Sequence, residues 1–364
     1  MGKIFLYQKI HDSILNEIRD GKYKEGEKLP DDKAMCEQCG VSMITLNKAL
    51  RLLAEEGYVK RVPGNGTYVN HRMKTEKKAE KRGKIIGVIL EHISSPFGLE
   101  MMYWIDLVAM REGYRTIVRF SYGEREQETK EIKFLLGLGV EGLIIMPSHG
   151  KHYNQDILRL CLNGFPIVLV DKKMKGIPVP SVRTDNRAAI TVLVRALAEA
   201  GNRRIAFIST DDQRADSVKE RRNGFISEME KLGLEEAGIC VVSSGITREE
   251  YMDNNPSPKV VYEIRKFLEQ NRGEMDAIIA SEYGIVQEIM KAMKYENVIP
   301  GEDIKLACID EDYMAPEGFR FMHVKQNEKE IAQKALDLLF AQIDGQEGEE
   351  DDILIPGIFC KVGK

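Results

Sequence analysis

The sequence has few of the features that mark secreted, membrane-bound or fibrous proteins. Only 6 of its 364 residues are cysteine, too few for a disulfide scaffold, so we expect reduced thiols in a cytoplasmic protein. No apolar run approaches the roughly 18 residues that a membrane span needs. The first residues have no long apolar core and no small-residue cleavage site, which argues against a secretory signal. With 12 Pro and 31 Gly, the composition is neither collagen-like nor disordered.

Motifs of common enzyme classes are also missing. The sequence contains no P-loop and no G-x-S-x-G. Residues 137–142 match G-x-G-x-x-G, but they follow a predicted helix and precede a predicted strand, the reverse of the order that a dinucleotide needs. Cys36 and Cys39 have metal or redox spacing without a second pair nearby. We therefore expect no enzyme, no metal site and no cofactor.

Charge is distributed unevenly along the chain. Residues 1–84 contain 18 Lys+Arg and 12 Asp+Glu, whereas the remainder contains 35 and 46. A basic head on an acidic body suggests that the head meets a polyanion, although a difference of this size also fits chance. Residues 71–84 are lysine-rich without a periodic apolar face, which is typical of a solvated linker. We expect a head at 1–72, a linker at 73–84 and a body at 85–364.

The head has the pattern of a winged helix-turn-helix. Apolar residues at helical spacing between residues 7 and 18 predict a first helix that Gly21 ends. A second helix starts near Pro30 and ends at Gly40, and a third runs from Ser42 to near Gly57. Strands at 58–62 and 67–69 then flank a glycine-rich tip, as in a hairpin.

In a helix-turn-helix the second helix lies in the major groove, and its N-terminal residues reach base edges. The predicted base contacts are Ser42, Met43, Ile44, Thr45, Asn47 and Lys48. Asn47 can form a bidentate pair with adenine, and the apolar groups of Met43, Ile44 and Thr45 can contact thymine methyl groups. The predicted phosphate contacts are Lys33, Lys48, Lys60 and Arg61, and the predicted wing tip is Gly64, Asn65 and Gly66.

These residues resemble the GntR-type DNA-binding domain over nearly all of residues 4–70. The resemblance rests on Tyr7-Gln8-x-Ile10, Leu29-Pro30, Gly40-Val41-Ser42 and Gly64-x-Gly66-Thr67-x-Val69. The family's Leu-Pro-Ser-Glu reads Leu-Pro-Asp-Asp here, and its two base-reading arginines fall on Met43 and Asn47. The resemblance therefore implies an operator weighted toward A·T pairs. The open alternative is a winged domain used for protein contacts only.

Downstream of the linker, apolar strand patterns alternate with amphipathic helices, which predicts parallel sheets with helices on both faces. The candidate strands are 85–90, 115–120, 143–146, 167–170, 205–209, 240–243, 277–280 and 306–309. So many strands favour an α/β body of two Rossmann-like lobes with a ligand cleft. We expect lobe 1 at about 85–210 and 316–345, lobe 2 at about 211–315 and 346–364, and a solvated loop at 345–352.

Polar residues directly after predicted strands are candidates for a ligand cleft, because ligands bind at the carboxyl ends of parallel strands. Carboxylates facing an arginine suit a polyhydroxy ligand, and an aromatic ring suits a sugar face. For several of these candidates the sequence leaves a purely structural role open. Asp171 and Asp185 also fit helix or turn caps, Arg221 also fits a surface ion pair, and Phe97 also fits the core.

The body resembles the effector domain of the lactose/galactose-repressor family. The resemblance rests on Val182–Asn186, Gly201–Ile208, Glu220–Phe225, Ile309–Asp312 and Val324–Gln326. It implies that Arg221 and Asp310 bind ligand hydroxyls and that a set of further residues lines the cleft: Ser95, Phe97, Asp185, Glu282 and Gln326. A GntR-type head on such a body is similar to the arabinose repressors of Gram-positive bacteria, which implies a sugar, with a pentose as the first candidate.

The sequence thus predicts a homodimeric repressor that binds double-stranded operator DNA and a small-molecule effector, with a sugar as the first candidate. Effector binding shifts the lobes and changes the spacing of the heads. One alternative is a regulator that senses a nucleoside or a sugar phosphate through Lys172, Lys173 and Lys175. The other is an α/β sugar-modifying enzyme with a DNA-binding head.

Overall fold

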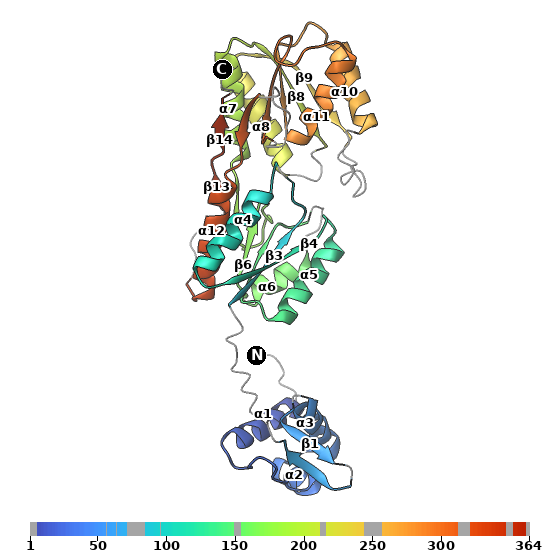
Figure 1. Cartoon of the computed structure of the whole chain (residues 1–364), viewed down its shortest axis with the longest axis vertical. Coiled ribbons are helices and arrows are strands. Elements are labelled where there is room, and N and C mark those ends of the chain that lie inside the picture. Colours follow the sequence, from blue (N-terminus) through green and yellow to red (C-terminus); the bar gives the residue numbers. More distant parts are fainter. Residues whose placement is uncertain are drawn as a thin grey trace. The chain divides into compact units, whose positions relative to one another are not determined.

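A computed structural model shows two compact units, Met1–Arg82 and Gly83–Lys364 (Figure 1). The residues that the structure describes are 6–55, 57–62, 64–70, 84–94, 96–148, 154–211, 216–243, 257–311, 321–346 and 352–361. The predicted linker lies outside this part of the chain, apart from Lys84. We describe each unit by itself.

The first unit is a winged helix-turn-helix, as the sequence predicts. Its elements are α1 (Leu6–Arg19), α2 (Asp32–Cys39), α3 (Met43–Glu55) and the antiparallel hairpin of β1 (Val59–Val62) and β2 (Gly66–Val69). Asp31 caps α2 by accepting the backbone N–H groups of Lys33 and Ala34, and Gly40 ends it in the left-handed conformation. Leu46, Leu50 and Leu53 recur at helical spacing on α3 and are fully buried against α1 and α2.

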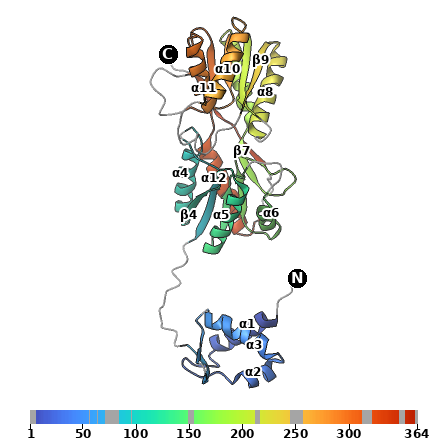
Figure 2. The same cartoon turned by 90° about the vertical axis from the view of Figure 1, so that its right-hand side faces the viewer.

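The second unit contains two six-stranded sheets with helices around them (Figures 1 and 2). The first sheet has the order β13-β7-β6-β5-β3-β4 and all its strands are parallel. Its strands are β3 (Ile85–Leu90), β4 (Arg115–Phe120), β5 (Gly142–Ile145), β6 (Ile167–Val170), β7 (Ser181–Thr184) and β13 (Asp352–Ile355). The helices of this lobe are α4 (Leu99–Arg111), α5 (Arg125–Leu138), α6 (Gln155–Leu162) and α12 (Glu328–Ile343). Helix α12 packs on α4 and against β5, β6 and β7.

The second sheet has the order β14-β12-β11-β10-β8-β9, and only the β12–β14 pair is antiparallel. Its strands are β8 (Arg204–Thr210), β9 (Glu235–Val242), β10 (Ala277–Ala280), β11 (Lys305–Ile309), β12 (Met322–Lys325) and β14 (Ile358–Cys360). Its helices are α7 (Asn186–Glu199), α8 (Asp216–Leu232), α10 (Pro258–Gln270) and α11 (Tyr283–Tyr295). Among the helices of the described residues, none combines the length and the apolar character of a membrane span.

The predicted division into lobes is wrong in three places. Strand β8 was expected in lobe 1 but belongs to the second sheet, together with β12. Strand β13 was expected as the end of a solvated loop and then lobe 2, but it pairs with β7 in the first sheet. The reason is that the chain passes between the lobes three times, after β7, after β12 and after β13. The strands β7 and β12 have polar sequences, and no local pattern shows with which strand β13 pairs.

Candidate functional site

The predicted DNA contacts of the head lie at the start of α3 and along the hairpin. The Ser42 hydroxyl accepts the backbone N–H of Thr45 at 3.3 Å and lies 2.9 Å from its hydroxyl, so it caps α3. Met43 is 42% exposed on the first turn. The Lys48 ammonium lies 4.0 Å from the centre of the Tyr7 ring, a cation–π contact that fixes its direction. The side chain of Ile44 lies outside the described part of the structure.

Arg61 of β1 reaches across to both helices of the turn motif. One terminal nitrogen of its guanidinium donates to Asp32 Oδ2 at 2.6 Å and to Asn47 Oδ1 at 2.8 Å. The three residues therefore form a connected group that joins the hairpin, the start of α2 and the recognition helix α3. The sequence predicted Asp32 only as a helix-start residue, and it did not predict this connection.

The hairpin tip is open to solvent and is built from glycines. Gly64 and Gly66 have φ values of 75° and 116°, a region that favours glycine. A side chain at Gly66 would meet Lys28 Cε at 2.6 Å. Asn65, between them, is exposed, and so is Lys33 at the start of α2. The backbone of the tip can therefore approach a partner closely.

In the body, several predicted effector residues gather around Asp310. This residue directly follows β11, has a left-handed backbone with φ 64°, and is only 4% exposed. Its carboxylate accepts the backbone N–H of Gln326 at 3.0 Å and the Gln326 side-chain amide at 2.7 Å. Burial raises the pKa of Asp310 to about 6, against the opposing charge of Arg221. A strained, buried carboxylate at the carboxyl end of a strand is typical of a functional site.

Arg221 and Gln326 continue this cluster toward the first lobe. Arg221 is 5% exposed and donates to Asn186 Oδ1 and to the Ser281 carbonyl, both at 2.8 Å, so it is no surface ion-pair residue. Gln326 Oε1 accepts the hydroxyl of Thr184, at the end of β7, at 2.7 Å. Glu282, half-buried, precedes α11, and its charge raises the pKa of Asp310. Four predicted residues thus share one neighbourhood: Arg221, Glu282, Asp310 and Gln326.

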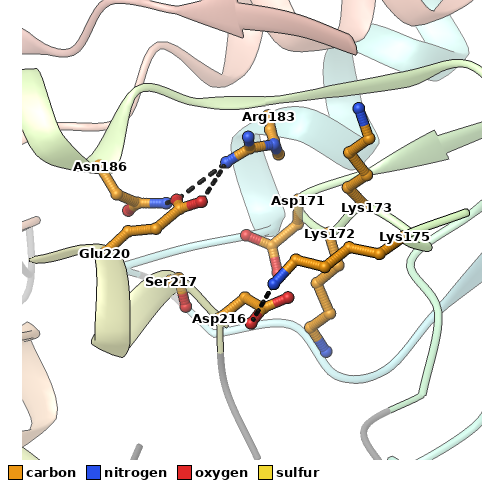
Figure 3. A pocket seen from close by; sticks show the side chains of 9 residues that line it. All are labelled: Asp171, Lys172, Lys173, Lys175, Arg183, Asn186, Asp216, Ser217 and Glu220. Atoms are coloured by element: carbon orange, nitrogen blue, oxygen red, sulfur yellow. Dashed lines mark hydrogen bonds and ion pairs between the residues drawn. The ribbon is translucent and has the colours of Figure 1, made fainter. Parts of the chain in front are cut away.

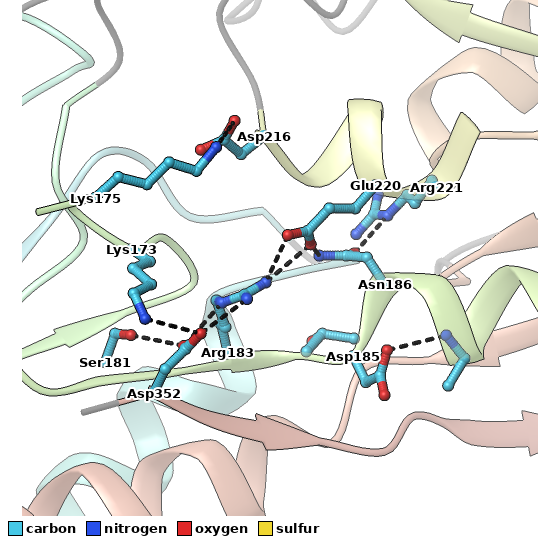
Figure 4. Close-up of polar contacts among 12 residues, drawn as sticks. Lys173, Lys175, Ser181, Arg183, Asp185, Asn186, Asp216, Glu220, Arg221 and Asp352 are labelled. Carbon is cyan, nitrogen blue, oxygen red and sulfur yellow. Dashed lines mark hydrogen bonds and ion pairs between the residues drawn. The ribbon is translucent and has the colours of Figure 1, made fainter. Parts of the chain in front are cut away.

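The other predicted effector residues behave differently. The Asp185 carboxylate accepts the backbone N–H of Ala188 at 3.0 Å and so caps α7, the alternative that the sequence left open (Figure 4). Phe97 is half-buried and packs against the core of the first lobe, in agreement with the core position that the sequence left open for it. Ser95 lies outside the described residues.

A small pocket opens near the crossing from β7 to α7 (Figure 3). Its walls come from the turn after β6, from Arg183 and Asn186, and from the start of α8. The lining residues are Asp171, Lys172, Lys173, Lys175, Arg183, Asn186, Asp216, Ser217 and Glu220. Of the candidates that the sequence offered, Asp171 and the three lysines are among them, whereas Arg221, Asp310 and Gln326 are not. The three lysines are those that the sequence suggested for a phosphate.

Arg183 is the centre of the ionic network beside this cavity (Figure 4). Its guanidinium bonds both oxygens of Glu220 on α8, at 3.0 and 2.8 Å, and both oxygens of Asp352 on β13, at 3.0 Å each. Lys175 adds a second link between the lobes, to Asp216 at 3.1 Å. Burial favours a higher pKa for Asp352, but hydrogen bonds from Arg183 and Ser181 hold that pKa below its usual value. The network therefore ties the two lobes together.

One buried carboxylate was missed entirely. Glu328, at the start of α12, accepts the backbone N–H groups of Gly98 at 2.9 Å and Met101 at 2.7 Å, at the start of α4. Burial raises its pKa to about 7. The local signal for this site is Asn327, which caps the start of α12 and was not used for a prediction. In the described residues, no group of three or more His, Cys, Asp or Glu side chains is arranged to hold a metal ion.

Comparison with known proteins connects both units to regulators. Residues 6–69 match the family described as "Bacterial regulatory proteins, gntR family". Residues 83–315 match "Periplasmic binding proteins and sugar binding domain of LacI family". An arabinose metabolism transcriptional repressor of Geobacillus stearothermophilus is 22% identical over 344 residues, which cover 93% of this chain and 91% of the relative.

Two solved structures show the same fold as the body. A putative ribose operon repressor from Burkholderia thailandensis has a TM-score of 0.63 and 23% identity, covering 77% of this chain and all of its own. The Cra regulator of Pseudomonas putida, solved in complex with fructose 1-phosphate, has a TM-score of 0.63 and 18% identity, covering 77% and 98%. The chain therefore belongs to the family of periplasmic binding proteins and LacI-type sugar-binding domains, and with its gntR-type head it is a DNA-binding transcriptional regulator.

Proposed function

We propose that the protein is a repressor whose affinity for operator DNA falls when a sugar binds beside Asp310. The observation that carries this proposal is the buried cluster of Asp310, Arg221 and Gln326 at the carboxyl ends of β11 and β12. A carboxylate accepts hydrogen bonds from sugar hydroxyls, and a guanidinium donates to them. The hydroxyl of Ser281, buried and without a partner among the described residues, adds a further polar group there.

The mechanism that we propose is a shift between two arrangements of the lobes. Hydrogen bonds link the first lobe to the second in pairs: Thr184 with Gln326, Arg183 with Glu220, and Lys175 with Asp216. A ligand that competes for Gln326 or Asp310 changes the balance of these contacts, because it binds one arrangement better than the other. In a homodimer, a rotation of the lobes alters the distance between the two DNA-binding heads. The heads must meet half-sites about one helical turn apart. Effector and operator then weaken each other's binding equally.

A sugar phosphate is the second candidate effector. Lys173, Lys175 and Arg183 line the cavity near the lobe crossing, and each of them pairs with a carboxylate in this structure. A phosphate with about two negative charges could replace those carboxylates as the partner of the cations. The solved relative that holds fructose 1-phosphate has the same fold.

Titration calorimetry with the full chain and a panel of sugars, sugar phosphates and nucleosides separates these candidates. For a neutral sugar we expect Asp310→Asn to weaken binding at least tenfold, since Asn offers one acceptor oxygen instead of two. Glu311→Gln is the matched control, a neighbouring carboxylate that is partly exposed and should leave the affinity unchanged. Binding that depends on Lys173 and Lys175 but not on Asp310 would instead support a phosphate. We further propose that the effector is not turned over; its recovery unchanged, followed by NMR, tests this.

A bacterial operator lies in the cytoplasm, so the proposal also places the protein there. The domain limits that we propose are a DNA-binding head at 1–72, a linker at 73–84 and an effector and dimerisation domain at 85–364. Sedimentation of the full chain tests the homodimer: a mass near twice 41.3 kDa is expected, and a monomer at operator-binding concentrations would contradict it.

A further inference from the structure

Asn186, the first residue of α7, lies between two charged residues of α8 (Figure 4). It is only 3% exposed. Its Oδ1 accepts from Arg221 Nε at 2.8 Å, and its Nδ2 donates to Glu220 Oε2 at 3.2 Å. A flipped amide would place its NH2 group against the guanidinium, where no acceptor exists. Both ends of this amide are therefore engaged, in one orientation only.

The contact with Arg221 fixes the direction of the guanidinium. Asn186 holds Nε, and the Ser281 carbonyl accepts from Nη1 at 2.8 Å. Two held nitrogens define the plane of a rigid guanidinium group. Among the described residues, no hydrogen bond engages the third nitrogen, Nη2. That nitrogen is therefore available to donate to a ligand hydroxyl.

The contact with Glu220 leads to the other lobe. Both oxygens of Glu220, on α8 of the second lobe, accept from Arg183 Nη1, at 3.0 and 2.8 Å. Arg183 belongs to β7 of the first lobe. Asn186 thus lies in a continuous series of contacts that runs from the ion pair between the lobes to the buried guanidinium of Arg221.

A second buried amide has the same arrangement. Gln326, also 3% exposed, donates to Asp310 and accepts from Thr184, both at 2.7 Å. Thr184 directly follows Arg183 at the end of β7. Each of the two groups proposed to hold the sugar is therefore linked to the end of β7 through one amide. Gln326 was a sequence candidate for the effector site, whereas Asn186 was not.

We propose that Asn186 is a positioning residue that orients Arg221 for the sugar and connects that guanidinium, through Glu220, to Arg183 of the first lobe. A sugar that draws Arg221 toward its hydroxyls changes the bond to Asn186 and, with it, the contact of Asn186 with Glu220. The ion pair between the lobes then changes in strength, which shifts the balance between the two arrangements of the lobes. The proposal rests on the proposed function and adds the route by which the effector acts on the lobes.

Two quantities measured on the full chain test this proposal. One is the affinity of the DNA-free chain for a probe, by titration calorimetry, with arabinose, ribose, xylose and fructose 1-phosphate as probes. The other is the coupling factor, the ratio of the operator affinities without and with a saturating probe. Asn186→Leu removes both hydrogen bonds at similar volume. Asn202→Leu is the matched control, because Asn202 is buried just beyond the other end of α7 and its amide donates to the Leu197 carbonyl.

We expect Asn186→Leu to weaken probe binding about tenfold, the effect of a lost hydrogen bond to a charged group. It should also reduce the coupling factor at least about threefold. Asn202→Leu should lower the midpoint of urea unfolding and leave both quantities within about twofold of the wild type.

Glu220→Ala separates the two roles, because it interrupts the series of contacts and keeps the bond between Asn186 and Arg221. We expect this variant to bind the probe within about twofold of the wild-type affinity and to lose at least about threefold in the coupling factor. A residue that only supports the fold would not give this split. Circular dichroism confirms that each variant is folded, and Glu220→Ala decides the question if Asn186→Leu does not fold.

A wild-type coupling factor in Asn186→Leu or in Glu220→Ala would overturn the proposal. Equal behaviour of Asn186→Leu and Asn202→Leu would also overturn it and make Asn186 a structural residue. These failures differ from a failure of the proposed function, in which the operator affinity of the wild type responds to none of the probes and this proposal fails with it.

Discussion

Removal of Arg183 should destabilise the effector domain more than removal of any exposed arginine. Its side chain is 13% exposed and makes four hydrogen bonds, two to Glu220 and two to Asp352. Arg183→Met would leave two partly buried carboxylates without their shared cation. Breaking a buried ion pair from one side costs about 3–5 kcal/mol. Because Glu220 and Asp352 keep 30% and 20% exposure, we expect a loss near the lower limit, about 3 kcal/mol.

Urea unfolding is the appropriate assay, because the chain has one tryptophan. Trp104 lies on α4 of the first lobe, with Lys329 of α12 over its ring, so its fluorescence reports on that lobe while circular dichroism follows both. Arg187→Met is the matched control: this arginine is exposed on α7 and should change the unfolding free energy by less than about 0.5 kcal/mol. A loss below about 1 kcal/mol for Arg183→Met would refute our view that the network ties the lobes together.

Three further predictions follow from buried or charged groups. Since burial raises the pKa of Glu328 from 4.5 to about 7, the folded state holds that proton more tightly, and the unfolding free energy should fall on the order of 3 kcal/mol as pH rises from 4.5 to 7. Glu328→Gln, which keeps a neutral acceptor for Gly98 and Met101, should reduce that fall in pH-dependent urea unfolding; an unchanged slope would contradict the assigned pKa. Leu50→Ala, in the core of the head, should lower the free energy of unfolding of the head by about 2–5 kcal/mol. It should abolish operator binding in gel shifts and leave effector binding intact; loss of both would show that the units do not fold separately. Operator affinity should fall steeply with salt, in a log–log plot with a slope of about −0.9 per phosphate contact; a flat plot would exclude phosphate-anchored binding.

The sequence predicted those strands that carry continuous apolar runs. Ile85–Leu90, Ile167–Val170 and Ala277–Ala280 have the expected limits, because central strands of a parallel sheet are buried on both faces and read as apolar segments. Arg115–Phe120 also has the expected limits, although it is an edge strand with two exposed arginines. The winged head was predictable for a similar reason: its caps, glycines and apolar spacing all agree with one fold.

The strands that were missed lie at the crossings between the lobes. Strands β7 (Ser-Val-Arg-Thr) and β12 (Met-His-Val-Lys) carry polar residues that make cross-lobe contacts, so their sequences lack an apolar run. Strand β13 pairs with β7, about 170 residues earlier in the chain. No local pattern contains that information, and so the lobe limits derived from it were wrong.

The candidate site was predictable where a residue follows an apolar strand, as Asp310 does after β11. It was not predictable where the partners come from distant segments. The contacts of Arg183 with Glu220 and Asp352 depend on the first crossing, which leads to α8 in the second lobe, and on the second, which returns the chain to β13 in the first. Asp32 looked like a helix-start residue, and only the fold shows that it lies beside Arg61.

Coupling between effector and operator is the central claim of the proposed function. Fluorescence anisotropy of a labelled operator duplex, titrated with the full chain at one fixed salt concentration, measures that coupling directly. We predict that a saturating sugar weakens operator binding about 5- to 150-fold in the wild type and much less in Asp310→Asn. Operator affinity that no sugar or sugar phosphate changes, or that changes equally in Asp310→Asn, would contradict it.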